Sequence, residues 1–333
     1  MSVRITRRRA ITVLAAAAGL PLIWHASQAQ AARLIRWEGT TLGAPSTIQL
    51  YHTDEAQARA AIEAGLAELA RLEQIFSVYR ADSELSALNR DGRLESASPE
   101  MIEMLTRARE LARISDGVYD PTIQPVWQLY FRHFTAANPD PNGPAAEDLK
   151  AALALVDWRG IEIDPLARRV TLARPGMAVT LNSGAQGYIT DRVAQILRDH
   201  GFSSMLVDMG EQRALEPKPD GSAWKIGIAN PADPNRAVSE IDVVNKAVST
   251  SGGYGTLFDD AGRFTHLIDS RTGQTAPALV GVSVVAPTAT QADGLSTALL
   301  LAPAERRQAI LRAAGGETAI FVTPDGVTAT VTA

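Results

Sequence analysis

The chain of 333 residues contains 32 Lys and Arg, 37 Asp and Glu, and no cysteine, which gives a formal charge of −5. Without cysteine it has no disulfide, no thiolate metal site and no cysteine nucleophile. The five histidines are scattered singly, so any metal should be a hard ion held by oxygen, and the acidic balance argues against binding to nucleic acid.

Residues 1–31 are typical of a bacterial export signal. Arginines at positions 4 and 7–9 precede an apolar stretch over 10–24 and a small-x-small cleavage site at 29–31. The pattern Thr-Arg-Arg-Arg-Ala-Ile resembles a twin-arginine signal, the route for folded proteins. We therefore expect a periplasmic domain over 32–333, with a retained N-terminal anchor as the alternative. Removal of the four arginines would change the formal charge to −9.

The hydrophobic pattern of the remaining chain interleaves helices with strands. It predicts a β-hairpin over 34–51, then helices over 55–76 and about 99–114 with Ser98 as the N-cap of the second. After a Pro/Gly/Asn-rich loop at 135–147, the predicted elements are a helix through 154, strands at 160–163 and 169–172, a helix at 186–200, strands at 204–209, 224–229, 247–251, 264–269 and 280–286, helices at 291–301 and 303–313, and strands at 317–323 and 327–331. Because there is no long linker or internal repeat, we expect one large α+β domain.

The segment 180–191 is the first candidate for a functional site. Small residues stand where a predicted strand ends and a helix begins, so a ligand can approach the backbone there. The free N–H groups of the helix N-terminus would suit an anion such as a pyrophosphate. The alternative is a turn that packs a strand closely against a helix.

The predicted helix over 291–301 carries Asp293 and Thr297, four residues apart and therefore on one face. A carboxylate and a hydroxyl presented together suit Mg²⁺. The alternative is an ordinary solvated helix face.

Residues in four further segments are candidates for binding or catalysis. Ser251 and Gly252 stand where a predicted strand enters a Gly-rich turn that can hold a flavin or a phosphate. His266 lies on the next predicted strand, where a structural histidine is the alternative to a catalyst. Tyr79 and Tyr119 are each either a stacking surface for an aromatic ring or a half-buried core residue.

In this order, the segments resemble the ApbE family, the FAD:protein FMN transferases, from about Trp37 to Leu301. The matching motifs are Phe-Ser-x-Tyr at 76–79 with Ser83-Glu84 and Leu88-Asn89, Tyr-Asp-Pro-Thr at 119–122, Gly-x-x-Gly-Tyr at 184–188 with Asp191, Ser-Gly-x-Tyr at 251–254, His-x-Ile-Asp-x-Arg-Thr-Gly at 266–273, and Ala-Asp-x-x-Ser-Thr-Ala at 292–298. The resemblance implies a single large ApbE-type, T-fold-like α+β domain of mixed sheets with packed helices.

The resemblance also implies an activity and its residues. Members cleave FAD at its pyrophosphate, transfer FMN to a Thr or Ser hydroxyl of a flavoprotein and release AMP. The implied magnesium ligands are the backbone carbonyl of Ala185 and the side chains of Asp293 and Thr297. The implied FAD contacts are Leu42, Tyr79, Val118, Tyr119, Asp120 and Thr180. Asp293 is the first candidate for the base that takes the acceptor's proton, and His266 is the second.

The chain departs from the usual family pattern at three places. It has Thr180-Leu181-Asn182 where many members have Asp-Leu, Leu42 in place of Met, and Gly210-Glu211 in place of Gly-Gly. The Thr-Leu-Asn variant, together with the twin-arginine-like signal, resembles the NosX branch, accessory proteins of nitrous oxide respiration. That resemblance implies a membrane-bound, NosR-like acceptor.

Two other activities stay open at this point. The first is an FAD pyrophosphatase that gives FMN and AMP, with water in place of the acceptor hydroxyl. The second is a non-catalytic periplasmic protein that binds or delivers flavin, against which the presence of Asp293 and Thr297 counts.

Overall fold

One eight-stranded sheet organises the computed structural model, which describes residues 32–277 and 280–333. In spatial order its strands are β1 (Arg33–Thr41), β2 (Ala44–His52), β6 (Met205–Asp208), β7 (Gln212–Leu215), β10 (Lys246–Gly252), β11 (Gly281–Ala286), β12 (Thr318–Val322) and β13 (Thr328–Thr332). A small sheet contains β3 (Arg93–Leu94), β5 (Arg169–Leu172) and β4 (Ile161–Asp164), and a ribbon contains β8 (Trp224–Asn230) and β9 (Asp233–Val243). Every pairing in the described chain is antiparallel. The expected export signal lies outside these residues.

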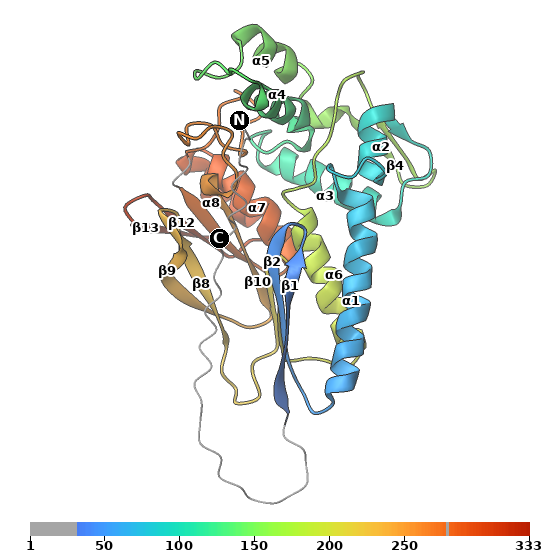
Figure 1. Ribbon diagram of the computed structural model, residues 1–333, viewed down its shortest axis with the longest axis vertical. Coiled ribbons are helices and arrows are strands. Elements are labelled where there is room, and N and C mark those ends of the chain that lie inside the picture. The colour runs from blue at the N-terminus through green and yellow to red at the C-terminus, as the bar shows by residue number, and fades with distance from the viewer. Residues whose placement is uncertain (1–31, 278–279) are drawn as a thin grey trace, which may run out of the picture.

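Some of the helices cover one face of the main sheet, and the β8–β9 ribbon covers part of the other. The helices are α1 (Glu55–Phe76), α2 (Glu84–Asp91), α3 (Pro99–Ile114), α4 (Gln124–Thr135), α5 (Ala146–Leu153), α6 (Ala185–Asp199), α7 (Ala289–Leu301) and α8 (Ala304–Ala313). Figure 1 shows α1 beside α6, and α7 packs against β10, β11 and α6. The result is the single α+β domain that the sequence predicts.

Helix α7 is the central helix of this packing. Ten of its thirteen residues are buried, including the polar Asp293, Ser296 and Thr297. A helix that is buried nearly all round belongs in a core, where each polar side chain needs a partner. The polar residues of α7 are therefore not on a solvated face, which was the alternative for Asp293 and Thr297.

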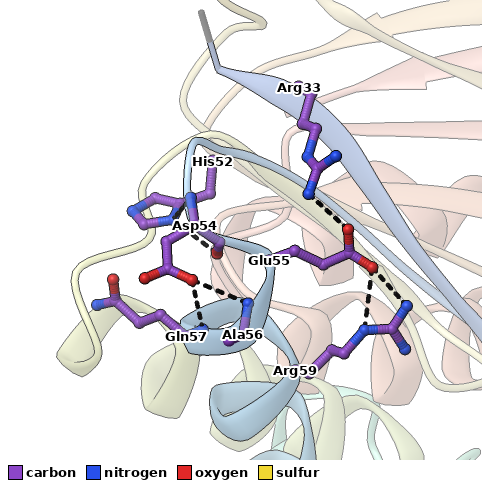
Figure 2. Close-up of polar contacts among 7 residues, drawn as sticks. All are labelled: Arg33, His52, Asp54, Glu55, Ala56, Gln57 and Arg59. Carbon is purple, nitrogen blue, oxygen red and sulfur yellow. Dashed lines mark hydrogen bonds and ion pairs between the residues drawn. The ribbon is translucent and has the colours of Figure 1, made fainter. Parts of the chain in front are cut away.

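The start of α1 shows how the sequence defines a helix boundary (Figure 2). The Asp54 carboxylate accepts hydrogen bonds from the backbone N–H groups of Ala56 (2.9 Å) and Gln57 (3.0 Å), as an N-cap does. Glu55 forms ion pairs with Arg33 of β1 and Arg59 of α1. The first strand and the first helix are therefore joined at this point.

One predicted element is wrong and several were not predicted. The segment predicted as a strand at 264–269 makes only isolated bridges, Leu257 to Thr265 and Ile268 to Thr275. Its backbone bonds to neighbouring loops, with His266 N–H donating to the carbonyl of Thr256, so the adjacent apolar residues Leu267 and Ile268 are buried in a loop rather than in a sheet. The elements absent from the prediction are α2, α4, β3, β7 and β9.

In the described part of the chain, no helix combines the length and the apolar character needed to cross a membrane.

Candidate active site

Several candidate residues meet at one end of the main sheet. Leu42 occupies the turn between β1 and β2, where its φ of 54° is in the left-handed region. Strand register sets Thr47 opposite Asp208 and Gln212 opposite Val248, so this turn, the β6–β7 turn at Gly210 and the end of β10 lie at the same end of the sheet. The hydroxyl of Thr41 contacts the sulfur of Met209, which joins the first two turns.

The carboxylate of Asp293 lies against the first turn of α6. Its Oδ2 accepts a hydrogen bond of 3.0 Å from the backbone N–H of Gly187. A Cβ on Gly187 would lie 2.3 Å from the carbonyl oxygen of Ala289, so glycine allows α6 and α7 to approach this closely. Glycine at position 187, two residues after Ala185, therefore allows the Asp293 carboxylate of α7 to reach the N-terminus of α6.

Thr297 and Ser251 are also in contact. The Ser251 Oγ at the end of β10 lies 3.0 Å from Thr297 Oγ1 and 2.7 Å from Ser296 Oγ. Thr297 is 7% exposed and Asp293 is 4% exposed. The structure thus brings together three of the predicted residues, from β10 and α7.

Tyr119 belongs to the same group of residues. It is buried and its hydroxyl is hydrogen-bonded to Ser183, at the end of the segment that leads into α6. Burial, followed by the charges of Asp293 and Asp120, raises the pKa of Tyr119 above its ordinary range. Tyr119 therefore stays protonated beside the carboxylate, and its ring is core rather than an exposed stacking surface.

Tyr79, in contrast, is an exposed aromatic ring. It is 72% exposed, and its hydroxyl accepts a 3.0 Å hydrogen bond from Asn182 Nδ2. The segment that carries Asn182 is held in turn by the side chain of Asn89, which binds both the N–H and the carbonyl of Val179. Thr180 donates its N–H to the carbonyl of Pro121. The Thr-Leu-Asn variant thus lies directly beside the exposed ring.

Val118 and Asp120 are engaged in internal contacts. The Asp120 carboxylate accepts hydrogen bonds from Thr122 and from the N–H of Trp158, while burial raises its pKa. The carbonyl of Val118 accepts a hydrogen bond from the Ser270 hydroxyl. The side chain of Asp120 therefore stabilises the turn at 120–122. Ser270, from the motif at 266–273, binds the backbone just before that turn.

His266 has a defined tautomer when neutral. Its Nδ1 lies 3.1 Å from the carbonyl oxygen of Thr256, which can only accept, so Nδ1 carries the proton and Nε2 is the basic nitrogen. The ring packs against Gly255, where a Cβ would lie 3.1 Å from Cε1. This arrangement is compatible with either a base or a structural histidine.

Two surface cavities accompany the site without containing its central residues. The first, of about 410 Å³, is lined by residues that include Gly117, Asp120 and Ser270 and the arginines Arg159, Arg174 and Arg271. The second, of about 290 Å³, lies over α6 and includes Asp191 and Arg213. Neither cavity is lined by Asp293, Thr297 or Ser251.

Asp191 stands in one of the family motifs, but the sequence predicts no role for it. Its carboxylate accepts hydrogen bonds from the N–H groups of Ala289 and Thr290 and from the Thr290 hydroxyl, so it caps α7 from α6. Helix N-termini favour negative side chains for this reason. The available signal in the sequence was an acidic residue of the motif, one helical turn after Gly187. It could indicate a capping residue, but the sequence does not show which helix that residue caps.

The candidate metal ligands suit a small, hard cation. They are one carboxylate, one hydroxyl and one backbone carbonyl, all oxygen, at a buried position. Groups of three or more His, Cys, Asp or Glu side chains able to hold a metal are absent from the described residues. A site built here thus depends on Asp293 for its only side-chain charge, with further ligands left to substrate phosphates and water, as is usual for Mg²⁺.

Comparison with known proteins identifies the family of the chain. A model of the ApbE family matches residues 42–321. The chain is 30% identical over 288 residues to an FAD:protein FMN transferase of Klebsiella pneumoniae (strain 342), covering 84% of this chain and 81% of the relative. It is 32% identical over 295 residues to the protein of the same name from Treponema pallidum (strain Nichols), covering 81% and 79%.

Solved structures resemble the fold. The flavinyl transferase ApbE of Pseudomonas stutzeri, in its apo form, superposes with a TM-score of 0.74 at 29% identity, covering 90% of this chain and 95% of that one. An ApbE protein of Thermotoga maritima superposes with a TM-score of 0.79 at 23% identity, covering 90% and 97%, which is a likeness of fold alone.

Proposed function

The chain belongs to the ApbE family, and from this we propose that it is a Mg²⁺-dependent FAD:protein FMN transferase. The observation that carries the proposal is the contact between the Asp293 carboxylate and the N-terminus of α6. It puts the acid of α7 at the first turn of α6, where the positive end of the helix dipole makes a suitable place for a metal-bound pyrophosphate.

In the proposed reaction, the hydroxyl oxygen of a Thr or Ser on an acceptor protein attacks the phosphorus on the FMN side of FAD. The new P–O bond forms as the bond to the bridging oxygen breaks, and AMP leaves with that oxygen. Mg²⁺, when bound, would neutralise the pyrophosphate and the charge that develops on AMP. The acceptor's proton passes to a base of the chain, for which Asp293 and the Nε2 of His266 are the candidates.

An exposed ring and three nearby backbone segments support the proposed binding of flavin. The exposed ring of Tyr79, fixed by Asn182, offers a planar face for stacking on an aromatic ring system. The turn that carries Leu42, the backbone near Thr180 and the Ser251-Gly252 turn would border the rest of FAD.

We further propose a periplasmic location and a membrane-bound, NosR-like acceptor. The twin-arginine-like pattern in residues 1–31 supports export, and the Thr180-Leu181-Asn182 variant supports the NosX branch. Both parts of this proposal depend on the sequence.

The test mixes the purified protein with FAD, Mg²⁺ and the periplasmic domain of a NosR-like acceptor, followed by denaturing electrophoresis and in-gel flavin fluorescence. We expect a fluorescent acceptor band that requires Mg²⁺ and is lost with Asp293→Ala. Release of FMN and AMP with no labelled acceptor would indicate a pyrophosphatase instead. Retention of full transfer by Asp293→Ala would contradict the metal and base assignment.

A further inference from the structure

Three hydroxyl groups form a connected chain beside the candidate metal ligands. Ser296 Oγ lies 2.8 Å from the backbone carbonyl oxygen of Asp293, Ser251 Oγ lies 2.7 Å from Ser296 Oγ, and Thr297 Oγ1 lies 3.0 Å from Ser251 Oγ. Ser296 and Thr297 are buried, with 1% and 7% of their surface exposed. Ser251 is half-buried, so two of the three hydroxyl groups are shielded from bulk water, and each hydrogen bond between them uses a proton of one of these hydroxyls.

The direction of each hydrogen bond follows from counting protons, because a hydroxyl has one proton to donate. A carbonyl oxygen only accepts, so Ser296 donates its proton to Asp293. In the 2.7 Å contact between the two serines, Ser296 must therefore accept and Ser251 must donate. The single hydroxyl proton of Ser251 is used in this hydrogen bond. The 3.0 Å contact between Ser251 and Thr297 must therefore use the proton of Thr297.

This direction has a consequence for Thr297. A threonine inside a helix commonly donates to the carbonyl four residues earlier. For Thr297 that residue is Asp293, whose carbonyl already receives the proton of Ser296. With its own proton turned toward β10, the oxygen of Thr297 keeps its lone pairs for another partner.

We propose that Ser251 and Ser296 are positioning residues, which turn the hydroxyl proton of Thr297 away from the metal site and so present its lone pairs to a divalent cation. The inference rests on the proposed function, which assigns Mg²⁺ to Asp293 and Thr297. Ser251 is suited to the task because β10 is held rigidly: it pairs with β11, and Thr250 bonds the hydroxyl of Ser283 across the two strands. In Figure 1, α7 lies against β10.

The chain offers a matched control for this test. Ser249 stands two residues before Ser251 on β10 and is 1% exposed, and in the described structure its Oγ is buried with no hydrogen-bond partner. Ser249→Ala therefore removes a buried hydroxyl from the same strand without removing a hydrogen bond.

The experiment measures Mn²⁺ and Mg²⁺ affinity, by electron paramagnetic resonance and calorimetry, for the full chain with FAD present. We expect Ser251→Ala to weaken metal binding about tenfold or more, as loss of an orienting partner of a ligand does. Ser296→Ala should weaken it in the same sense, Ser251→Thr should restore it, and Ser249→Ala should leave it within about twofold. Ser296→Ala also serves as the second variant if Ser251→Ala does not fold.

The possible failures are distinguishable. Wild-type affinity in Ser251→Ala and Ser296→Ala, with affinity lost in Asp293→Ala, would overturn the positioning role and leave the metal site intact. Wild-type affinity in Asp293→Ala and Thr297→Val would overturn the metal site and this inference with it. Equal losses in Ser251→Ala and Ser249→Ala would show that strand packing, rather than proton direction, determines the affinity.

Discussion

The carboxylate of Asp293 and the backbone N–H of Gly187 are 3.0 Å apart, and this one hydrogen bond joins the acid of α7 to the first turn of α6. Because the contact depends on the close approach of two helices at a residue without a side chain, it links the stability of the packing to the arrangement of the candidate ligands.

Gly187→Ala should lower both stability and metal binding. The added Cβ would lie 2.3 Å from a backbone oxygen, so α6 and α7 must separate, which we expect to cost about 1–3 kcal/mol of unfolding free energy. Gly65→Ala in α1 is the control, because the nearest atom there is a methyl of Val193 at 3.1 Å and helix propensity favours alanine. Urea denaturation measures the difference; equal stability of the two variants would contradict it.

Tyr79→Ala should weaken FAD binding and leave the fold unchanged. The ring is 72% exposed, so its removal costs little folding free energy, whereas loss of a stacking partner typically costs about 1–3 kcal/mol. We expect the dissociation constant for FAD, from quenching of flavin fluorescence, to rise about tenfold. Tyr79→Phe keeps the ring and loses only the hydrogen bond from Asn182. If Tyr79→Phe lowers the affinity for FAD as much as Tyr79→Ala does, stacking on the ring is excluded.

Asp208 should make stability depend on pH. Burial raises the pKa of this carboxyl from 3.8 to about 6, although Gly210 N–H and Gln212 donate hydrogen bonds to it. Between these values the folded state holds the proton and the unfolded state releases it, so stability falls as pH rises from about 4 to about 6.

Asp208→Asn tests this directly. The substitution removes the titration, so its advantage over the wild type should grow through that window and level off above it, reaching on the order of 3 kcal/mol at most. Denaturation series from pH 4 to 8 provide the comparison. Asp199→Asn, at an exposed position of α6, is the control. If the difference in unfolding free energy between Asp208→Asn and wild type does not change with pH, the pKa of the Asp208 carboxyl is not raised in the folded state.

The two candidate bases can be separated by kinetics. His266→Gln should lower the rate of FMN transfer at most about tenfold, since Asp293 lies at the site and His266 is held by Thr256. Asp293→Ala should lower it by about 10³-fold and also reduce metal affinity. Single-turnover rates across pH 5–9 check this. A 10³-fold loss in His266→Gln with normal metal binding would identify His266 as the base.

Apolar spacing and N-cap residues were enough to predict helices whose boundaries depend on neighbouring residues in the sequence. The apolar spacing from Glu55 to Phe76 and the cap at Ser98 predicted α1 and the start of α3 as the structure has them. Helix α4 was not predicted because it is rich in aromatic residues, which are modest helix formers; its stability comes from packing of Tyr130 and Phe134 against Phe258 and Phe264.

The candidate site, like the fold, could be predicted from the sequence only in part. The spacing of Asp293 and Thr297 along a helix indicated a shared face, but only the packed structure shows that this face is buried against Ser251 and Gly187. The role of Asp191 as the cap of α7 was not predictable, because it depends on the tertiary contact between α6 and α7. The strand predicted around His266 was wrong because its apolar neighbours Leu267 and Ile268 are buried in a loop, where the backbone makes only isolated bridges.

The order of strands in the main sheet bears on how the chain acquires its structure during synthesis. The inner partner of the first hairpin is β6, with Leu50 opposite Met205, so β2 leaves the ribosome long before its neighbour exists. Pairings between distant parts of a chain form slowly, because a large loop must close first. Asp293 and Thr297 are made later still, and a nascent chain therefore has no assembled site until almost all of it has been translated.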